Sequence, residues 1–109
     1  MFKITQSTSY TWPVSVNLAT DGGKFETQTF DGKFKRLGTE RLEQIREAVK
    51  SDKDFAEQVL EGWDGVTDGD GQAVPFSHGA LQQLLDIPGV ATAVVVAFLD
   101  SLAGLKRKN

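Results

Sequence analysis

The chain has 109 residues, of which 39% are hydrophobic and 25% charged, with no cysteine and a formal net charge of −3. This length and composition predict one folded domain, residues 1–109, with a modest core. The lack of cysteine excludes disulfides, thiolate catalysis and cysteine-based zinc sites. The charge is uneven, because residues 38–75 carry ten acidic and four basic side chains, and this argues against a nucleic acid partner.

Residues 1–37 are predicted to form a small antiparallel sheet. Apolar side chains occupy every second position over residues 10–18, which is the pattern of a half-buried strand. Pro13 has no N–H for a sheet hydrogen bond, so this strand should lie at an edge. Asp21-Gly22-Gly23 suits a tight turn, and a second strand begins at Lys24, so the two segments should form a hairpin.

The end of this sheet has two interpretations. Phe30 and Phe34 share a parity that Phe25 does not, so the alternation breaks between them. Asp31-Gly32 is either a tight turn into a third strand at residues 33–37 or a bulge that reverses the face of one long strand. The predicted sheet therefore has two or three strands, and its apolar face needs a cover of helices.

Residues 38–61 are predicted to form two amphipathic helices. Thr39 is a suitable N-cap for the first helix, and Ser51 with Asp54 has the capping-box spacing that starts the second. The second helix should stop at Gly62. The apolar stripes, at helical spacing, are Leu42, Ile45 and Val49 in the first helix and Phe55, Ala56, Val59 and Leu60 in the second.

Residues 62–76 are predicted to be a loop that places two aromatic side chains, Trp63 and Phe76, in the core. For Trp63 a partner-binding role is the alternative, because tryptophan is enriched at binding hot spots. The aspartates of the loop suggest calcium, but an EF-hand that starts at Asp68 puts Ala73 where glycine is required. The other register lacks a carboxylate at its first position, so we expect a turn-forming loop.

Residues 77–105 are predicted to form two C-terminal helices, followed by a basic tail at residues 106–109. Ser77 is a suitable N-cap, and Ile87-Pro88 should end the first of these helices and start the second. Over residues 89–99 only one side chain is polar. This run is too short to cross a bilayer, which needs about twenty apolar residues, so we expect a buried helix and no membrane association.

The last helix is also the predicted protein-interaction site. Small residues recur every four positions on one side of it, and large apolar residues lie beside them. A helix that is apolar nearly all round needs more cover than a domain of this size supplies, so we expect a homo-oligomer. The candidate interaction residues are Val90, Val94, Ala97, Phe98, Leu102 and Leu105.

No catalytic, cofactor-binding or metal-ligating residues are predicted. The single histidine, His78, has no serine or carboxylate at triad or ligand spacing, and we expect it to be exposed in a first helical turn. The glycines match neither of the two common phosphate-binding patterns. The first residues lack the long apolar core of a signal peptide. We therefore expect a cytoplasmic binding protein that is not an enzyme and needs no cofactor.

Four further features follow one another along nearly the whole chain. They are Phe34-Lys35-Arg36-Leu37 after the hairpin, Gly62-Trp63-Asp64-Gly65-Val66, Pro75-Phe76 followed by Leu84-Leu85-Asp86-Ile87-Pro88-Gly89-Val90, and a short helix with a basic Lys108-Asn109 ending. In their order and spacing they resemble the tail assembly chaperones of long-tailed bacteriophages and prophages.

This resemblance implies a non-enzymatic, oligomeric protein with two partners. It would keep the tape measure protein soluble while tail tube protein subunits polymerise around it, and it would be absent from the mature virion. A tape measure protein is largely helical, so recognition of a helix in an apolar groove is a reasonable mode. The alternatives are a tail-completion or connector protein that stays in the particle, and a regulatory protein-binding module.

Overall fold

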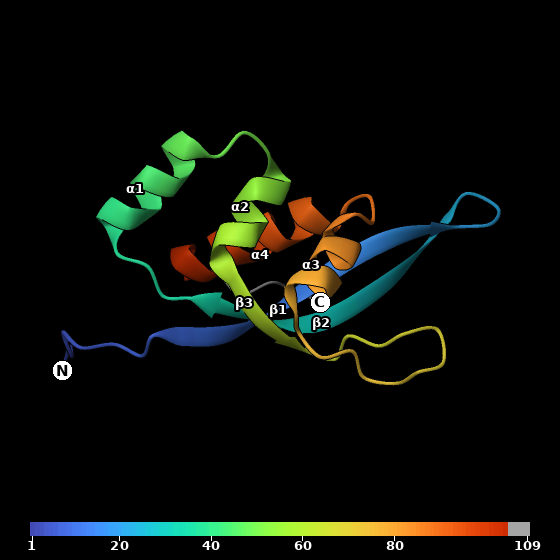
Figure 1. Ribbon diagram of the computed structural model, residues 1–109, viewed down its shortest axis with the longest axis horizontal. Helices are drawn as coiled ribbons and strands as arrows, with labels where there is room; N and C mark the ends of the chain where they lie inside the picture. The colour runs from blue at the N-terminus through green and yellow to red at the C-terminus, as the bar shows by residue number, and fades with distance from the viewer. Residues whose placement is uncertain (105–109) are drawn as a thin grey trace.

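The computed structural model describes residues 1–104, which form an antiparallel three-stranded sheet and four helices (Figure 1). The predicted α+β class is confirmed. The elements in chain order are β1 (Ser9–Thr20), β2 (Lys24–Lys35), α1 (Thr39–Ala48), α2 (Asp52–Val59), β3 (Leu60–Asp64), α3 (His78–Leu85) and α4 (Val90–Ala103). Leu105 and the predicted basic tail at residues 106–109 lie outside the described residues.

Strands β1 and β2 form one long hairpin with an unbroken register from Ser9↔Lys35 to Thr20↔Lys24. Asp31-Gly32 is therefore neither a turn nor a bulge in this pairing, so both interpretations of this position, a third strand at residues 33–37 and a bulge, are wrong. The parity change has a simpler cause: Phe25 points to the solvent side and is 72% exposed. The sheet order is β1-β2-β3, so the prediction that the first strand lies at an edge is confirmed.

The third strand is β3, which was predicted as the end of a helix and the start of a loop. Its pairing with β2 shifts register, because Phe34 faces Leu60 while Lys33 faces Gly62, which leaves Glu61 as an extra residue. This bulge places Leu60 on the same face as Trp63, although the two are three residues apart. Leu60 therefore continues the apolar stripe of α2 in sequence while it already belongs to the sheet.

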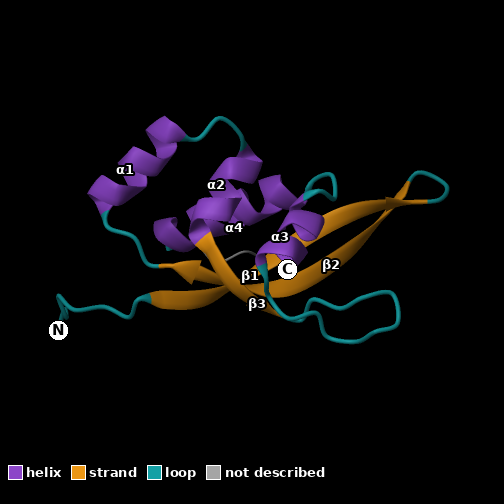
Figure 2. Ribbon diagram, in the orientation of Figure 1, coloured by secondary structure: helices purple, strands orange, loops and turns teal. Residues whose placement is uncertain are grey.

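All four helices lie together on one side of the strands (Figure 2). The other side of the hairpin is polar and exposed: the Ser15 and Thr29 hydroxyl groups lie 3.0 Å apart, and the Thr27 hydroxyl donates a hydrogen bond to the Asn17 side chain at 2.6 Å. Helix α4 packs against β1 and α2. The core that forms between sheet and helices has Phe34, Phe98, Val14, Val59 and Val94 as its largest fully buried side chains.

The helix starts follow the sequence in two of four cases. Ser51 Oγ accepts a hydrogen bond from the Asp54 N–H, and Ser77 Oγ accepts one from the Ala80 N–H, so both predicted caps are confirmed. Thr39 is not a cap, because α1 begins at this residue and Gly38 stands at the N-cap position without a side-chain bond. Pro88 precedes α4 rather than starting it, and Gly89 with φ of 90° makes the entry turn.

A side chain at Gly32 is expected to destabilise the fold. A Cβ at this position would lie 3.0 Å from a ring carbon of Phe34 and 3.1 Å from a methyl carbon of Leu60. Phe34 is fully buried and cannot move aside, so Gly32→Ala should lower the free energy of unfolding by about 1–2 kcal/mol despite the smaller entropy of the unfolded chain. Urea denaturation measures this. Gly38→Ala is the control, since a Cβ there meets nothing within 4 Å, and an equal loss in both variants would contradict the close-approach explanation.

Candidate protein-binding surface

Most of the predicted interaction residues are used by the core of the chain itself. Val90, Val94, Ala97 and Phe98 are between 0% and 4% exposed, and their side of α4 faces β1 and α2. A partner that binds the folded chain does not reach these four side chains. Leu102 is 48% exposed and stays available, while Leu105 lies outside the described residues.

The exposed side of α4 carries a second apolar set, in which Val96 and Leu99 join the predicted Leu102. Val96, Leu99 and Leu102 are 36%, 38% and 48% exposed. They are three residues apart, so they follow one another along one side of the helix. We call these three residues the outer stripe. Exposed large apolar side chains in a continuous patch are typical of a protein-binding surface.

The outer stripe ends in a groove between α4 and the edge strand β1. The groove has a volume of about 390 Å³, and Tyr10 and Trp12 of β1, Arg36 after β2, and Leu102 of α4 line it. Two contacts hold its wall in place. The hydroxyl groups of Tyr10 and Ser101 lie 2.7 Å apart, and the Arg36 guanidinium sits 4.7 Å from the centre of the Tyr10 ring.

The groove combines aromatic and charged groups that lie far apart in sequence. Tyr10 and Trp12 belong to the same alternating set of β1 as Val14 and Val16, but they are half-buried, whereas the two valines are buried. The signal that could have found them is their position at the outer end of an edge strand. The sequence around Arg36 did not indicate a place in this groove, because the hairpin register decides that Arg36 lies over Tyr10.

The loop aspartates have a structural role. Asp68 Oδ1 accepts hydrogen bonds from the N–H groups of Asp70 at 2.9 Å and Gln72 at 3.0 Å, which stabilises the turn between them. Within residues 1–104 no group of three or more His, Asp or Glu side chains could hold a metal ion. His78 is exposed at the start of α3, as predicted.

Trp63 belongs to the core side of β3, as its first interpretation predicted. Its ring packs edge-on against Phe76, with ring centres 4.8 Å apart, and its Nε1–H donates a hydrogen bond to the Val74 carbonyl at 2.7 Å. The centre of the Phe30 ring lies 6.5 Å from that of the Trp63 ring, also in an edge-on arrangement. Trp63 therefore holds the segment after β3 against the sheet and is not part of the outer stripe or its groove.

Over the described range, no single helix is long and apolar enough to cross a membrane. Helices α3 and α4 taken together have the length and apolar composition of a membrane span, but the chain bends by 102° between them.

The fold and this surface define a small α+β protein with an apolar stripe on its C-terminal helix and an aromatic groove beside it. Residues 28–101 match the model of the YdaY prophage protein family. The match begins within β2 and ends in the last turn of α4. The chain belongs to this family and is a prophage protein. No curated protein and no solved structure matches it significantly.

Proposed function

We propose that this prophage protein is a tail assembly chaperone that binds the tape measure protein, keeps it soluble and helps to recruit tail tube protein. In this proposal the protein is not an enzyme, acts in the cytoplasm of the host cell and is absent from the mature virion. The observation that carries the proposal is the outer stripe of α4, which presents three large apolar side chains to solvent next to an aromatic groove.

The proposed client contact is helix against helix. An amphipathic client helix with apolar residues at i, i+3, i+4 and i+7 would lay that face along the outer stripe. Trp12 and Tyr10 would then bury its end, because aromatic side chains supply large contact areas with few rotatable bonds. Membership of a prophage protein family supports the setting, and the resemblance of the whole chain to tail assembly chaperones supports the choice of client.

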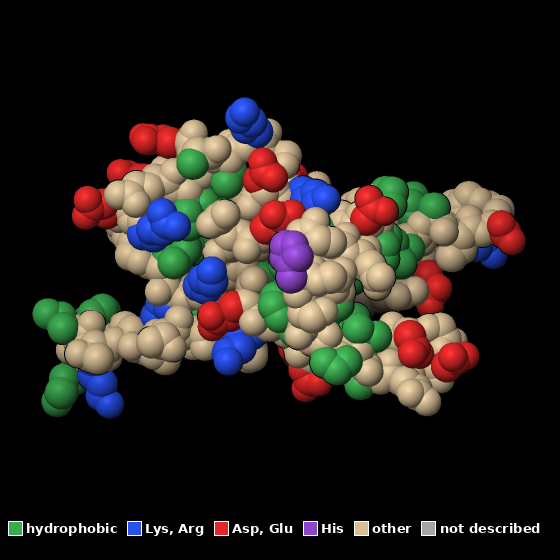
Figure 3. Space-filling model, viewed as in Figure 1, with side chains coloured by type: hydrophobic (Ala, Val, Ile, Leu, Met, Phe, Trp, Pro, Cys, Tyr) green, Lys and Arg blue, Asp and Glu red, His purple; other side chains and the backbone are tan. Residues whose placement is uncertain are grey.

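Helix α1, which carries three glutamates against Arg41 and Arg46, suits a protein that keeps an apolar client in solution. Glu40, Glu43 and Glu47 of α1 are exposed, and Figure 3 shows acidic side chains over this helix. Net negative charge at the surface of a complex opposes its aggregation. The proposed client surface is on α4 and the glutamates are on α1, so α1 would stay exposed while α4 holds the client.

Replacing Leu99 and Leu102 together with glutamate is expected to abolish capture of the tape measure protein. A client would bury the exposed part of each leucine, 38% and 48% of its surface, which is worth about 1 kcal/mol for the pair, and each glutamate would add the cost of taking a charge out of water, so the double substitution should weaken binding at least about tenfold. The measurement is co-expression with the tape measure protein encoded by the same prophage, followed by pull-down and quantification of the soluble client.

Phe25→Glu is the matched control for this experiment. Phe25 is also exposed and apolar, but it lies near the hairpin turn on the opposite side of the sheet. Its substitution should leave client capture unchanged. A wild-type protein that captures no tape measure protein would contradict the proposal. So would detection of this chain by mass spectrometry in purified virions, which favours the tail-completion or connector alternative.

A further inference from the structure

The first eight residues form an apolar arm that extends beyond the body of the protein (Figure 1). Met1, Phe2 and Ile4 are 120%, 89% and 94% exposed, so these side chains have almost no cover within the chain. Lys3 is the only charged side chain of the arm. The arm, defined as residues 1–8, is therefore a basic and apolar segment without a binding site of its own.

An apolar hollow lies farther along the sheet, toward the hairpin turn. This distal hollow has a volume of about 150 Å³ and lies between the hairpin, the loop after β3 and the end of α3. Leu18, Phe30, Val66, Leu84 and Ile87 supply most of its apolar lining. Ile87 is 42% exposed. An apolar cavity of about this volume can hold a benzene ring, which is the size of the phenyl group of Phe2.

The charge around the distal hollow is opposite to that of the arm. Acidic residues lie in the chain segments that form the hollow. Figure 3 shows acidic side chains at the loop ends on the right and the apolar arm on the left. Residues 18–30, 64–77 and 84–90 carry Asp21, Glu26, Asp64, Asp68, Asp70 and Asp86, and Lys24 is the one lysine or arginine among them. A positively charged segment is attracted to this end of the molecule.

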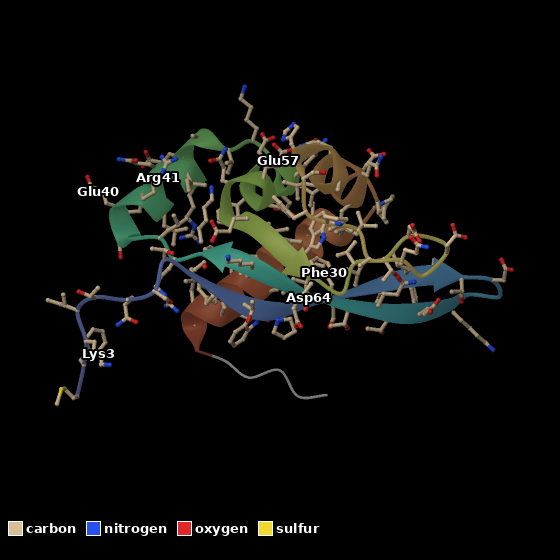
Figure 4. The ribbon with its side chains drawn as sticks, turned by 60° about the horizontal axis from the view of Figure 1, so that its bottom comes forward. Lys3, Phe30, Glu40, Arg41, Glu57 and Asp64 are labelled. Carbon is tan, nitrogen blue, oxygen red and sulfur yellow. The ribbon has the colours of Figure 1, made fainter. Side chains whose placement is uncertain are left out.

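The arm cannot fill the distal hollow of its own chain. Thr8 is held beside the end of β2, because its carbonyl accepts a hydrogen bond from the N–H of Arg36, the residue after this strand, at 3.0 Å. At about 3.3 Å per residue, Phe2 reaches about 20 Å from Thr8, whereas Val16, at the near edge of the hollow, lies about 26 Å along β1 in the other direction. Figure 4 shows Lys3 at one end of the molecule and Phe30 with Asp64 far from it.

We propose that copies of this chain associate head to tail, with the arm of one copy bound in the distal hollow of the next. Phe2 or Ile4 fills the hollow, and Lys3 lies among the acidic side chains around it. The two surfaces are different and lie far apart along the sheet (Figure 4), so the contact is heterologous, and a pair of copies keeps one free arm and one free hollow. Such contacts build rings or open chains. This inference does not depend on the identity of the client.

The test uses one variant for each end of the interface. The arm variant Phe2→Ser with Ile4→Ser, and the hollow variant Ile87→Glu, should each be monomeric in sedimentation velocity under conditions in which the wild type has a larger mass. Mixed in equal amounts, they should form a species of twice the monomer mass and nothing larger, because the arm variant has an intact hollow and the hollow variant an intact arm.

Three further samples keep this test decisive. Asp86→Lys changes an exposed residue beside the hollow and should weaken association without affecting the core, so it replaces Ile87→Glu if that variant does not fold. High salt should weaken association of the wild type. Phe25→Ser, which removes an exposed phenylalanine without adding charge, is the control and should associate like the wild type. A wild type that is monomeric at every concentration, a mixture that stays monomeric, or a control that dissociates like the variants would overturn the proposal.

Discussion

Replacing Phe98 with alanine is expected to cost about 3–5 kcal/mol of the free energy of unfolding, a large part of the roughly 5–15 kcal/mol that a domain of this kind has. Phe98 is 0% exposed. Its ring centre lies 5.5 Å from that of Phe34 in β2 and 5.8 Å from that of Phe55 in α2. Phe98 of α4 therefore joins its helix to both the sheet and α2, and a cavity at this point weakens both contacts. Urea denaturation followed by circular dichroism measures the change.

The neighbouring Leu99 provides the control for this experiment. It lies on the same helix but is 38% exposed, so Leu99→Ala should cost well under about 1 kcal/mol. The contrast between the two variants distinguishes the core side of α4 from its outer stripe. If Phe98→Ala were as stable as Leu99→Ala, Phe98 would not belong to the core and the assignment of the two sides of α4 would be wrong.

The parts of the fold that could be predicted from the sequence are those governed by local rules. The alternation in β1 places Val14 and Val16 in the core because successive side chains of a strand point to opposite faces. Ser51 and Ser77 cap helices because each hydroxyl accepts a hydrogen bond from a nearby N–H. The Asp21-Gly22-Gly23 turn closes the hairpin because glycine accepts positive φ, as Gly22 and Gly23 do at 80° and 76°.

Strand β3 could not be predicted, because two of its properties depend on distant residues. Its first residue, Leu60, extends the apolar stripe of α2, so helical periodicity continues past the real end of that helix. The bulge at Glu61 then puts Leu60 and Trp63 on one face, which contradicts the period of two that identifies a strand. The pairing with β2 decides both features, and no local pattern contains that information.

The candidate site was predicted only in part for a similar reason. The composition of α4 indicates a helix that is apolar nearly all round, but it does not say which side the sheet and α2 will cover. The prediction that Val90, Val94, Ala97 and Phe98 form an interaction face chose the side that the core takes. Leu102 is the predicted residue that remains exposed within residues 1–104, and Tyr10 and Trp12 join it through the position of β1 beside α4.

The second large effect is expected at Trp63. Trp63→Ala should cost about 2–3 kcal/mol, somewhat less than for a fully buried tryptophan because this side chain is half-buried. The substitution removes the packing against Phe76 and Phe30 and the hydrogen bond to the Val74 carbonyl. The segment that follows β3 then loses its attachment to the sheet. Its own backbone hydrogen bonds, Val74 N–H to Val66 at 2.8 Å and Asp68 N–H to Gln72 at 2.9 Å, should open more often.

Hydrogen exchange of these amides separates loss of this attachment from a general loss of stability. In Trp63→Ala the amides of Val74 and Asp68 should exchange faster by a larger factor than those of α2, because they depend directly on the indole. Trp63→Phe keeps an aromatic ring beside Phe76 but has no N–H donor, so it should cost about 1 kcal/mol for the lost hydrogen bond and accelerate exchange at Val74 less strongly. Equal acceleration of all amides in Trp63→Ala would show that Trp63 stabilises the core as a whole and does not specifically hold this segment.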